Sequence, residues 1–410
     1  MSVISDASED SGQDRRTGRR RPGYLAAAAV FAVGMLGTTL PTPLYGLYRQ
    51  QLGFSELVVT VVFAAYAVGV IAALLIAGGF SDVLGRRPVL LAALGLSALS
   101  AVCFLTEGGL PLLYAGRVLS GFSAGLLSGT GTAAVLELAP KGRQARAGFA
   151  ATAANMGGLG LGPLLSGILA EYAPQPLKLP FAVHLGLLAA AAAVVCVLPE
   201  TVHRSDPRGS LRPQGMTVPP EVRGVFAPCA LAAFAGFSML GLFTAVAPAF
   251  LNQTLGERNL AVAGAVVFCV FCASTGGQLL MGRIGARRAL PWGCAVLVAG
   301  LVLIALSLLL TSFPLLLAGA LTGGAGQGMA FRAGLSEVSS AAPEAHQGAT
   351  ISAFFVVAYV GISLPVVGVG ALTSALGLRD AGLVFAGCAV LLVAAVGARV
   401  SRTLSRASDR

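Results

Sequence analysis

The chain has 410 residues, of which 56% are hydrophobic and only 11% are charged, and its formal net charge is +10. Soluble domains carry about 25% charged residues, so this composition excludes a soluble protein. The apolar residues form long continuous runs without the alternation of a membrane β-barrel, which leaves an all-α integral membrane protein in a lipid bilayer.

The positive charge is concentrated in polar segments between the apolar runs, such as 1–22, 139–146 and 200–224. An excess of Lys and Arg on one side of a membrane is the positive-inside pattern of cytoplasmic loops, whereas a nucleic-acid-binding protein carries a basic patch. We therefore expect a multi-pass protein of the cell membrane with no nucleic-acid partner.

The first 22 residues are polar and Arg-rich, which predicts a disordered cytoplasmic tail over 1–22. A signal peptide is the competing interpretation, but the apolar run at 24–40 is too long for a cleaved segment. It is therefore expected to be the first spanning helix, followed by an external loop over 49–55. Roughly 20 apolar residues cross about 30 Å of hydrocarbon, which predicts further helices at 56–79, 88–105, 110–138, 147–172 and 179–198.

The segment 200–224 interrupts the apolar pattern with prolines and arginines, which predicts a cytoplasmic linker between two bundles, 23–199 and 225–400. Residues 401–410 are expected to form a second cytoplasmic tail. Twelve spans place both termini on the same, cytoplasmic side. The six spans of the second bundle are expected near 225–251, 259–281, 289–312, 314–338, 348–375 and 380–398.

The two bundles share a repeated pattern. The segments 110–121 and 313–324 are identical at half of their positions, and the residues at 85–87 have a degenerate counterpart at 285–287. Such internal similarity indicates a duplicated structural unit. The sequence therefore predicts two pseudo-symmetric six-helix bundles.

A charged turn follows the second expected helix. Its spacing is Gly78-x-x-x-Asp82-x-x-Gly85-Arg86-Arg87, in which Asp82 can form an ion pair with Arg86 and the two arginines indicate a cytoplasmic loop. This spacing resembles motif A of the major facilitator superfamily, a family of transporters. The resemblance implies the major facilitator fold, with twelve membrane-spanning helices, and a gating role for the turn.

Arg117 lies within the helix expected at 110–138. A charge at the centre of a spanning helix costs about 2.5–3.5 kcal/mol on insertion scales. Arg117 is therefore expected to face a polar cavity or to pair with another group. The spacing Arg117-x-x-x-Gly121-x-x-x-Gly125 resembles motif B of the superfamily, which implies a role for Arg117 in substrate binding or proton coupling.

The helix expected at 147–172 contains several glycines and one proline, which favour bending and close helix packing. A kinked packing helix is the simple interpretation. The spacing also resembles motif C of the drug:proton antiporters, with a serine where a glycine is usual, and this resemblance implies export. The residues concerned are Gly158, Gly162, Pro163, Ser166 and Gly167.

The group that couples transport to protons stays open at this point. The first expected helix has no Asp or Glu, where several drug antiporters of this type carry a coupling carboxylate. Other candidates are Asp82, Glu137, His184 and Glu337, and Arg332 is a further candidate for substrate binding or coupling. Arg332 and Glu337 are not expected to pair, because five residues separate them by about 140° around a helix.

No cofactor or metal is expected. Cys269 and Cys272 have the C-x-x-C spacing, but they lie in a predicted helix and have no second pair. A G-x-S-x-G pattern at 121–125 falls in mid-helix, where a nucleophile elbow cannot form, so an enzyme is not expected. The sequence contains no ATP-binding loop of the G-x-x-x-x-G-K-[ST] type, which predicts that an ion gradient and not ATP drives transport.

The sequence therefore favours a secondary transporter that works as a monomer, binds a small molecule and protons, and exports drugs or other amphipathic compounds. A sugar or small-metabolite carrier of the same superfamily is the first alternative. A membrane receptor or scaffold that does not transport is the second.

Overall fold

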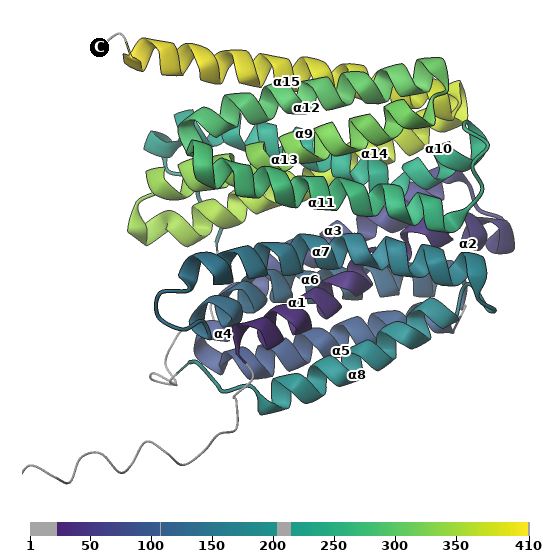
Figure 1. The fold of residues 1–410 in the computed structure, drawn as a ribbon, viewed down its shortest axis with the longest axis horizontal. Coiled ribbons are helices and arrows are strands. Elements are labelled where there is room, and N and C mark those ends of the chain that lie inside the picture. The colour runs from purple at the N-terminus through teal and green to yellow at the C-terminus, as the bar shows by residue number, and fades with distance from the viewer. Residues whose placement is uncertain (1–22, 107, 203–214, 409–410) are drawn as a thin grey trace, which may run out of the picture.

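The computed structural model describes residues 23–106, 108–202 and 215–408, and within these ranges every element of regular structure is a helix (Figure 1). Eleven helices in this part of the chain are long and apolar enough to cross a membrane. The expected tail at 1–22 and the central part of the expected linker, 203–214, lie outside the described residues.

The first half of the chain forms the purple-to-teal bundle of Figure 1. Six long segments cross this bundle, and short helices and turns join them. The elements are α1 (Tyr24–Thr39), η1 (Thr42–Leu44), α2 (Tyr45–Leu52), α3 (Glu56–Ala77), α4 (Phe80–Leu84), α5 (Arg86–Leu105), α6 (Gly109–Glu137), α7 (Gln144–Tyr172) and α8 (Leu179–Val197).

The second half forms the green-to-yellow bundle above it in the same view. It repeats the succession of six long segments with short helices between them. The elements are η2 (Pro220–Val222), α9 (Arg223–Ala245), α10 (Ala247–Gln253), α11 (Leu260–Ile284), α12 (Ala286–Leu310), α13 (Phe313–Ala341), η3 (Glu344–His346), α14 (Gln347–Leu376) and α15 (Leu378–Ser408).

The twelfth span is α13, which composition alone does not identify as a membrane helix. It has 29 residues and packs against α9, α11 and α12 inside the second bundle. Its glycines and polar residues, including Gln327 and Arg332, lower its hydropathy but face protein, where they contact other helices. The expected fold of twelve spans in two six-helix bundles is confirmed.

Two helices continue further than the sequence predicted. The external loop was expected over 49–55, but α2 extends to Leu52, because Pro43 starts a new helical turn and Gly53 ends it with a φ of +70°. Likewise, α15 extends through most of the tail expected at 401–410, since neither glycine nor proline occurs from Ala398 to Ser408.

The two bundles match in detail as well as in helix order. α5 and α12 both begin after a glycine with positive φ, Gly85 at +102° and Gly285 at +84°. An L side chain is strained in this conformation, which is why glycine occurs at both positions. The degenerate repeat at 85–87 and 285–287 therefore marks the same structural turn in each half.

Glycines also bring pairs of helices into backbone contact. A Cβ added to Gly121 of α6 would collide with the carbonyl oxygen of Tyr66 on α3, and one added to Gly328 of α13 would collide with that of Ser274 on α11. Small residues allow this close approach, which maximises dispersion contacts where the hydrophobic effect cannot drive helix association. The α3–α6 and α11–α13 contacts are thus equivalent in the two halves.

A Gly121→Leu variant is expected to lose about 1–3 kcal/mol of stability, because the backbones of α3 and α6 must separate to admit the side chain. Gly95→Leu on the exposed face of α5 is the matched control, since nothing lies within 4 Å of its added Cβ. Thermal unfolding in detergent can be followed with a dye that reacts with buried cysteines such as Cys229 and Cys294. Equal melting temperatures for the two variants would contradict the close α3–α6 contact.

Candidate functional site

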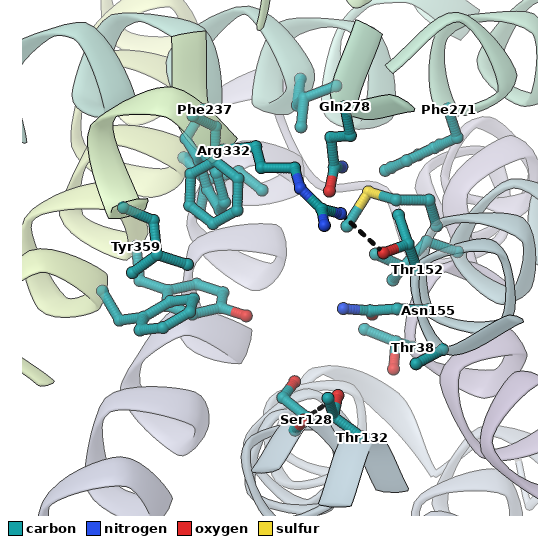
Figure 2. A pocket seen from close by; sticks show the side chains of 18 of the residues that line it. Thr38, Ser128, Thr132, Thr152, Asn155, Phe237, Phe271, Gln278, Arg332 and Tyr359 are labelled. Carbon is teal, nitrogen blue, oxygen red and sulfur yellow. Dashed lines mark hydrogen bonds between the residues drawn. The ribbon is translucent and has the colours of Figure 1, made fainter. Parts of the chain in front are cut away.

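A cavity of about 800 Å³ lies between the two halves. We call it the central cavity. The first half contributes side chains of α1, α3, α6 and α7 to its wall, and the second half contributes those of α9, α11, α13 and α14 (Figure 2). Its wall therefore consists of matching helices from the two bundles.

The wall is mostly apolar and rich in aromatic rings. Tyr66 of the first half meets Tyr359 of the second edge to face, with 6.1 Å between ring centroids, and Phe237 packs against Tyr359 at 5.7 Å. Edge-to-face pairs of this kind are favourable and leave ring faces available to a ligand. The aromatic residues that line the cavity are Phe63, Tyr66, Phe237, Phe271, Phe331, Phe355 and Tyr359.

Few polar groups in the wall are available to a ligand. The hydroxyls of Ser128 and Thr132 donate to carbonyls of their own helix, at 2.8 and 2.7 Å. Asn155 of α7 is different, because its buried Oδ1 has no hydrogen-bond partner in the described part of the chain. Asn155 and Gln278 are the two amide side chains among the described residues that line the cavity, and they belong to the adjacent helices α7 and α11 (Figure 2).

Two arginines are the charged residues among those that line the cavity, and no Asp or Glu of the described chain is among them. Arg332 extends from α13 towards α7, where its Nη1 donates to Thr152 Oγ1 at 3.2 Å (Figure 2). This hydrogen bond joins the two halves across the cavity. Neither arginine forms an ion pair within the described residues.

Arg117 is the more buried of the two, with 1% of its surface exposed. Its Nη1 donates to the carbonyl of Thr38 at 2.6 Å and its Nη2 to that of Phe63 at 3.4 Å, which ties α6 to α1 and α3. Its guanidinium lies 5.3 Å from the ring centroid of Phe63 and 5.0 Å from that of Tyr66, within cation–π range. The expected position of Arg117 away from lipid and at a cavity is confirmed.

The small residues that follow Arg117 on α6 have divided roles. Gly121 and Gly125 pack against the backbone of α3, whereas Ser128 and Thr132 line the cavity. This face of α6 therefore packs against α3 at one turn and lines the cavity at another.

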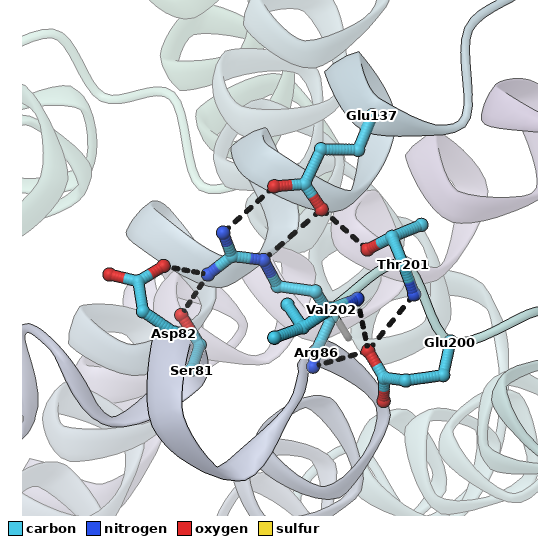
Figure 3. Close-up of polar contacts among 7 residues, drawn as sticks. All are labelled: Ser81, Asp82, Arg86, Glu137, Glu200, Thr201 and Val202. Atoms are coloured by element: carbon cyan, nitrogen blue, oxygen red, sulfur yellow. Dashed lines mark hydrogen bonds and ion pairs between the residues drawn. The ribbon is translucent and has the colours of Figure 1, made fainter. Parts of the chain in front are cut away.

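The charged turn forms a compact group of side chains around Arg86, which we call the turn cluster (Figure 3). The end of the molecule at which this cluster lies is called the turn end. Arg86 Nη1 lies 2.6 Å from Asp82, and Arg86 also binds both carboxylate oxygens of Glu137 at 2.8 and 3.2 Å. The expected Asp82–Arg86 ion pair is present, and Glu137 of α6 joins it. Thr201 completes the cluster by donating to Glu137.

Glu200, beyond the end of α8, binds the start of α5. Its carboxylate accepts the backbone N–H groups of Arg86 and Arg87 at 2.8 and 3.0 Å, and Gly85 leaves room because an added Cβ would lie 2.8 Å from Glu200. A carboxylate is favoured at a helix N-terminus by the unpaired N–H groups and the helix dipole. Partial burial alone would raise the pKa of Glu200, but the hydrogen bonds from Arg86, Arg87, Val202 and Thr201 outweigh it and lower the pKa.

All residues of the turn cluster belong to the first half. Gly78 ends α3, and Arg87 donates to the carbonyl of Cys196 on α8, so the remaining motif residues also stay within that bundle. The cluster therefore stiffens the first half and, in this conformation, makes no ion pair with the second half among the described residues.

A second group of contacts, which we call the latch, lies at the opposite end of the molecule. We call this end the latch end. Glu171 of α7 accepts the backbone N–H of Leu260 on α11 at 2.9 Å, and Asn259 donates to the Tyr172 hydroxyl at 3.0 Å. Glu56 of α3 accepts from Gln253 of α10 at 2.7 Å. The latch residues Glu56, Glu171, Tyr172, Gln253, Asn259 and Leu260 therefore bind the two halves to each other.

The glycine-rich segment of α7 supports the latch through packing. Gly158 and Gly162 pack against the backbone of α1, and Gly167 packs against the carbonyl of Leu260. Pro163 packs against Gly264 of α11. Ser166 is fully buried and donates to the carbonyl of Gly162 at 3.0 Å, so it serves the helix itself.

The other candidates from the sequence do not line the cavity. His184 of α8 is buried against Ser97 of α5, with 3.2 Å between Nε2 and Oγ. Glu337 lies on α13, as Arg332 does, but it is near Cys229 of α9. Arg332 and Glu337 form no ion pair, as expected from their spacing. The structure thus brings Arg117 and Arg332 to the cavity and leaves Asp82, Glu137, His184 and Glu337 elsewhere.

Sequence reasoning did not identify Asn155, Gln278 or Thr152 as cavity residues, or the latch as a site. Within residues 23–106, 108–202 and 215–408, no group of three or more His, Cys, Asp and Glu side chains is arranged to hold a metal ion. The chemistry available at the cavity is therefore non-covalent binding of a mostly apolar guest with a few directed polar contacts.

Comparison with known proteins assigns the family. The sequence pattern of the Major Facilitator Superfamily matches residues 25–366 of the chain. The chain belongs to the major facilitator superfamily. The family predicted from the charged turn is thereby confirmed.

The curated relatives of this superfamily member are distant. The quinolone resistance protein NorA of Staphylococcus aureus (strain MSSA476) is 24% identical over 57% of this chain and 60% of NorA. The putative multidrug resistance protein MdtD of Salmonella typhi is 31% identical over 35% of this chain and 30% of MdtD. The chain therefore aligns with less than two thirds of the length of either relative.

Solved structures of transporters share the fold over almost the whole chain. The human organic anion transporter MFSD10 (TETRAN) has a TM-score of 0.65 at 19% identity and covers 93% of this chain and 100% of its own. The nucleoside transporter NupG, solved as a mutant, has a TM-score of 0.68 at 14% identity and covers 92% of this chain and 99% of its own. At these identities the similarity shows the fold alone.

The lowered pKa of Glu200 makes its contribution to stability pH-dependent. A carboxylate whose pKa is lower in the folded state stabilises that state above its ordinary pKa of 4.5, and the contribution is lost as the pH falls through the lowered value. Glu200→Gln is therefore expected to cost about 0.3–1 kcal/mol at pH 7. Melting temperatures of the variant and the unmodified protein should converge on acidification.

Glu344→Gln serves as the control, because Glu344 is exposed and its carboxylate accepts no hydrogen bond in the described part of the chain. Its melting temperature should follow that of the unmodified protein at every pH. A Glu200→Gln deficit that stays constant down to pH 3 would show that the carboxylate charge does not stabilise the start of α5.

Proposed function

We propose that this transporter exports amphipathic organic compounds through the central cavity by alternating access, with proton entry as the driving force. The observation that carries the proposal is the cavity itself, which has a volume of about 800 Å³, lies between the halves and is lined by aromatic rings. Pockets for drug-sized molecules have volumes of about 300–1,000 Å³ and are mostly apolar, with a few polar groups that fix orientation.

The polarity of the wall favours amphipathic compounds over sugars. A sugar needs a hydrogen bond for most of its hydroxyl groups, because an unpaired buried hydroxyl is costly. Here the hydroxyls of Ser128 and Thr132 donate within α6, so they can only accept from a sugar. A flat apolar compound, in contrast, can stack on rings such as Phe237 and Tyr359.

The distribution of charge supports a cytoplasmic position for the turn end. Arg86 and Arg87 lie there, and Lys141, Arg143 and Arg146 follow α6 at the same end. Positive residues in short loops favour the cytoplasmic side. With this orientation both termini and the linker are cytoplasmic, as the sequence predicted.

This orientation places the open end of the cavity at the cytoplasm, as uptake of a substrate for export requires. The cavity wall extends to Leu136 of α6 and Ser339 of α13, close to the turn end, whereas the latch and the α7–α11 contact close the other end. The conformation therefore suits uptake of a substrate from the cytoplasm. NorA and MdtD, both named as resistance proteins, are consistent with export.

Proton coupling requires a titratable group whose contacts change between conformations. No carboxylate of the described residues lines the cavity, but Glu56 and Glu171 hold the two halves together at the latch end. A protonated carboxyl group is a weaker acceptor than a carboxylate, so protonation there would favour release of the latch. We place the proton-dependent step at these residues in preference to Glu137 or His184.

A carrier for a small polar metabolite is the second candidate. The two amides Asn155 and Gln278 in the wall favour it, because paired amides can recognise the edge of a planar heterocycle. The fold shared with a nucleoside transporter is compatible with this alternative.

Export is tested by accumulation of fluorescent dyes and antibiotics in an efflux-deficient host, with and without a protonophore. Ala133→Trp is expected to raise accumulation towards the level of the empty vector, because Ala133 lines the cavity and an indole there narrows it. Ala92→Trp, on the exposed face of α5, is the matched control and should export normally.

Both variants must be present in the membrane in equal amounts. Export that continues unchanged in Ala133→Trp would show that substrates do not pass through the cavity. Uptake of nucleosides or sugars by the intact protein, without export from a broad panel of dyes, would favour the second candidate.

A further inference from the structure

We propose that the central cavity selects amphipathic organic anions and that Arg332 binds their anionic group. This inference rests on the proposed function, because it assumes that the cavity takes amphipathic guests. It goes further by assigning the charge of the guest and the residue that recognises it.

The charge balance of the cavity is the first observation. Arg117 and Arg332 both line it, and no Asp or Glu of the described chain does. Neither arginine has a carboxylate partner within the described residues. Charges inside a membrane protein are costly unless they are paired, and those that persist without a partner mark binding sites and transport paths. A negatively charged guest would supply the missing partner.

The hydrogen bonds of the two arginines show which one is available. Arg117 is almost fully buried, and both of its terminal nitrogens donate to carbonyls that join three helices. Arg332 is only half-buried and has a single partner in the described part of the chain, the hydroxyl of Thr152. A guanidinium has five N–H donors in a planar fork, so Arg332 keeps enough of them for a bidentate bond to a carboxylate or sulfonate.

The surroundings of Arg332 define the rest of the guest. Figure 2 shows its guanidinium in the middle of the cavity, with Phe237 and Tyr359 on one side and Phe271 and Gln278 on the other. An aromatic ring attached to the anion would therefore contact these rings. Asn155 also lines the cavity, and Figure 2 shows its amide nitrogen directed into it, where it can donate a hydrogen bond to the same guest.

The same features act against cations. A cationic amphiphile would meet two positive charges in a mostly apolar wall, where repulsion is weakly screened and no carboxylate offsets it. The cavity therefore distinguishes guests of the same shape by the sign of their charge.

A purely structural role for Arg332 makes different predictions. Its bond to Thr152 joins the halves, so Arg332 could serve only to hold α13 against α7. In that case removing either partner should have the same consequence. If Arg332 binds an anion, removing the Thr152 hydroxyl instead frees the guanidinium for the guest.

Three dansyl compounds that share one fluorophore test the proposal. They are dansylglycine, an anion with a sulfonamide N–H, its neutral amide dansylglycinamide, and the cation dansylethylenediamine. Binding is measured by fluorescence titration of the full chain in lipid nanodiscs. The signal of protein-free nanodiscs of the same lipid composition is subtracted as the lipid background. We expect dansylglycine to bind about tenfold more tightly than the amide, with the cation weakest.

The variants separate charge recognition from structure. Arg332→Gln should remove the tenfold advantage of the anion while the neutral amide binds as before. Thr152→Val should increase that advantage, because it removes the hydroxyl that competes for the guanidinium. Arg288→Gln is the charge-matched control, since Arg288 is exposed on α12 and does not line the cavity, and it should preserve the advantage.

Each other outcome overturns the proposal in a recognisable way. Equal binding of the three compounds to the unmodified protein would refute anion selection while leaving transport of amphipathic compounds intact. Equal losses for all three compounds in both Arg332→Gln and Thr152→Val would show that Arg332 has a structural role only. Failure of all three to bind above the background would refute the amphipathic substrate class together with this inference.

Discussion

The contact of α7 with α11 is the constraint on which the rest of the structure depends. Gly167 of α7 packs against the carbonyl of Leu260, and Gly264 of α11 packs against that of Pro163. The backbones of α7 and α11 therefore touch at these glycines, where a larger side chain would hold them apart. Because the two halves are joined so closely at the latch end, they can separate towards the turn end. The central cavity exists because the contact closes one end only.

The arginines follow from a second constraint, that a polar group inside a membrane protein must find its partners within the protein. Arg117 satisfies this constraint by donating to carbonyls of α1 and α3, and it is therefore a fixed part of the cavity wall. Arg332 satisfies it only in part, because it donates to a single hydroxyl, that of Thr152 in the opposite half. In the proposed alternating access this bond would break when the halves move, which would tie the charge of the cavity to transport.

The sequence predicted what depends on local pattern and failed where distant segments converge. The spans, the duplication and the Asp82–Arg86 pair follow from apolar runs and from short spacing, and all are present. The roles of Glu137 and Glu200 could not be predicted, because 51 and 114 residues separate them from their partner Arg86. The latch was missed for the same reason, since Glu171 binds a backbone N–H, which has no signature in the sequence.

Alternating access of the two halves is the central claim, and distances between spin labels at both ends of the molecule test it most directly. Labels on Gln51 and Asn252 report the latch end and labels on Arg146 and Arg283 the turn end, with the native cysteines replaced. At rest the latch pair should be close and the turn pair far apart. A proton gradient with substrate should add a population in which the latch distance grows while the turn distance shrinks. If both distances change in the same direction, or neither changes, the account is contradicted.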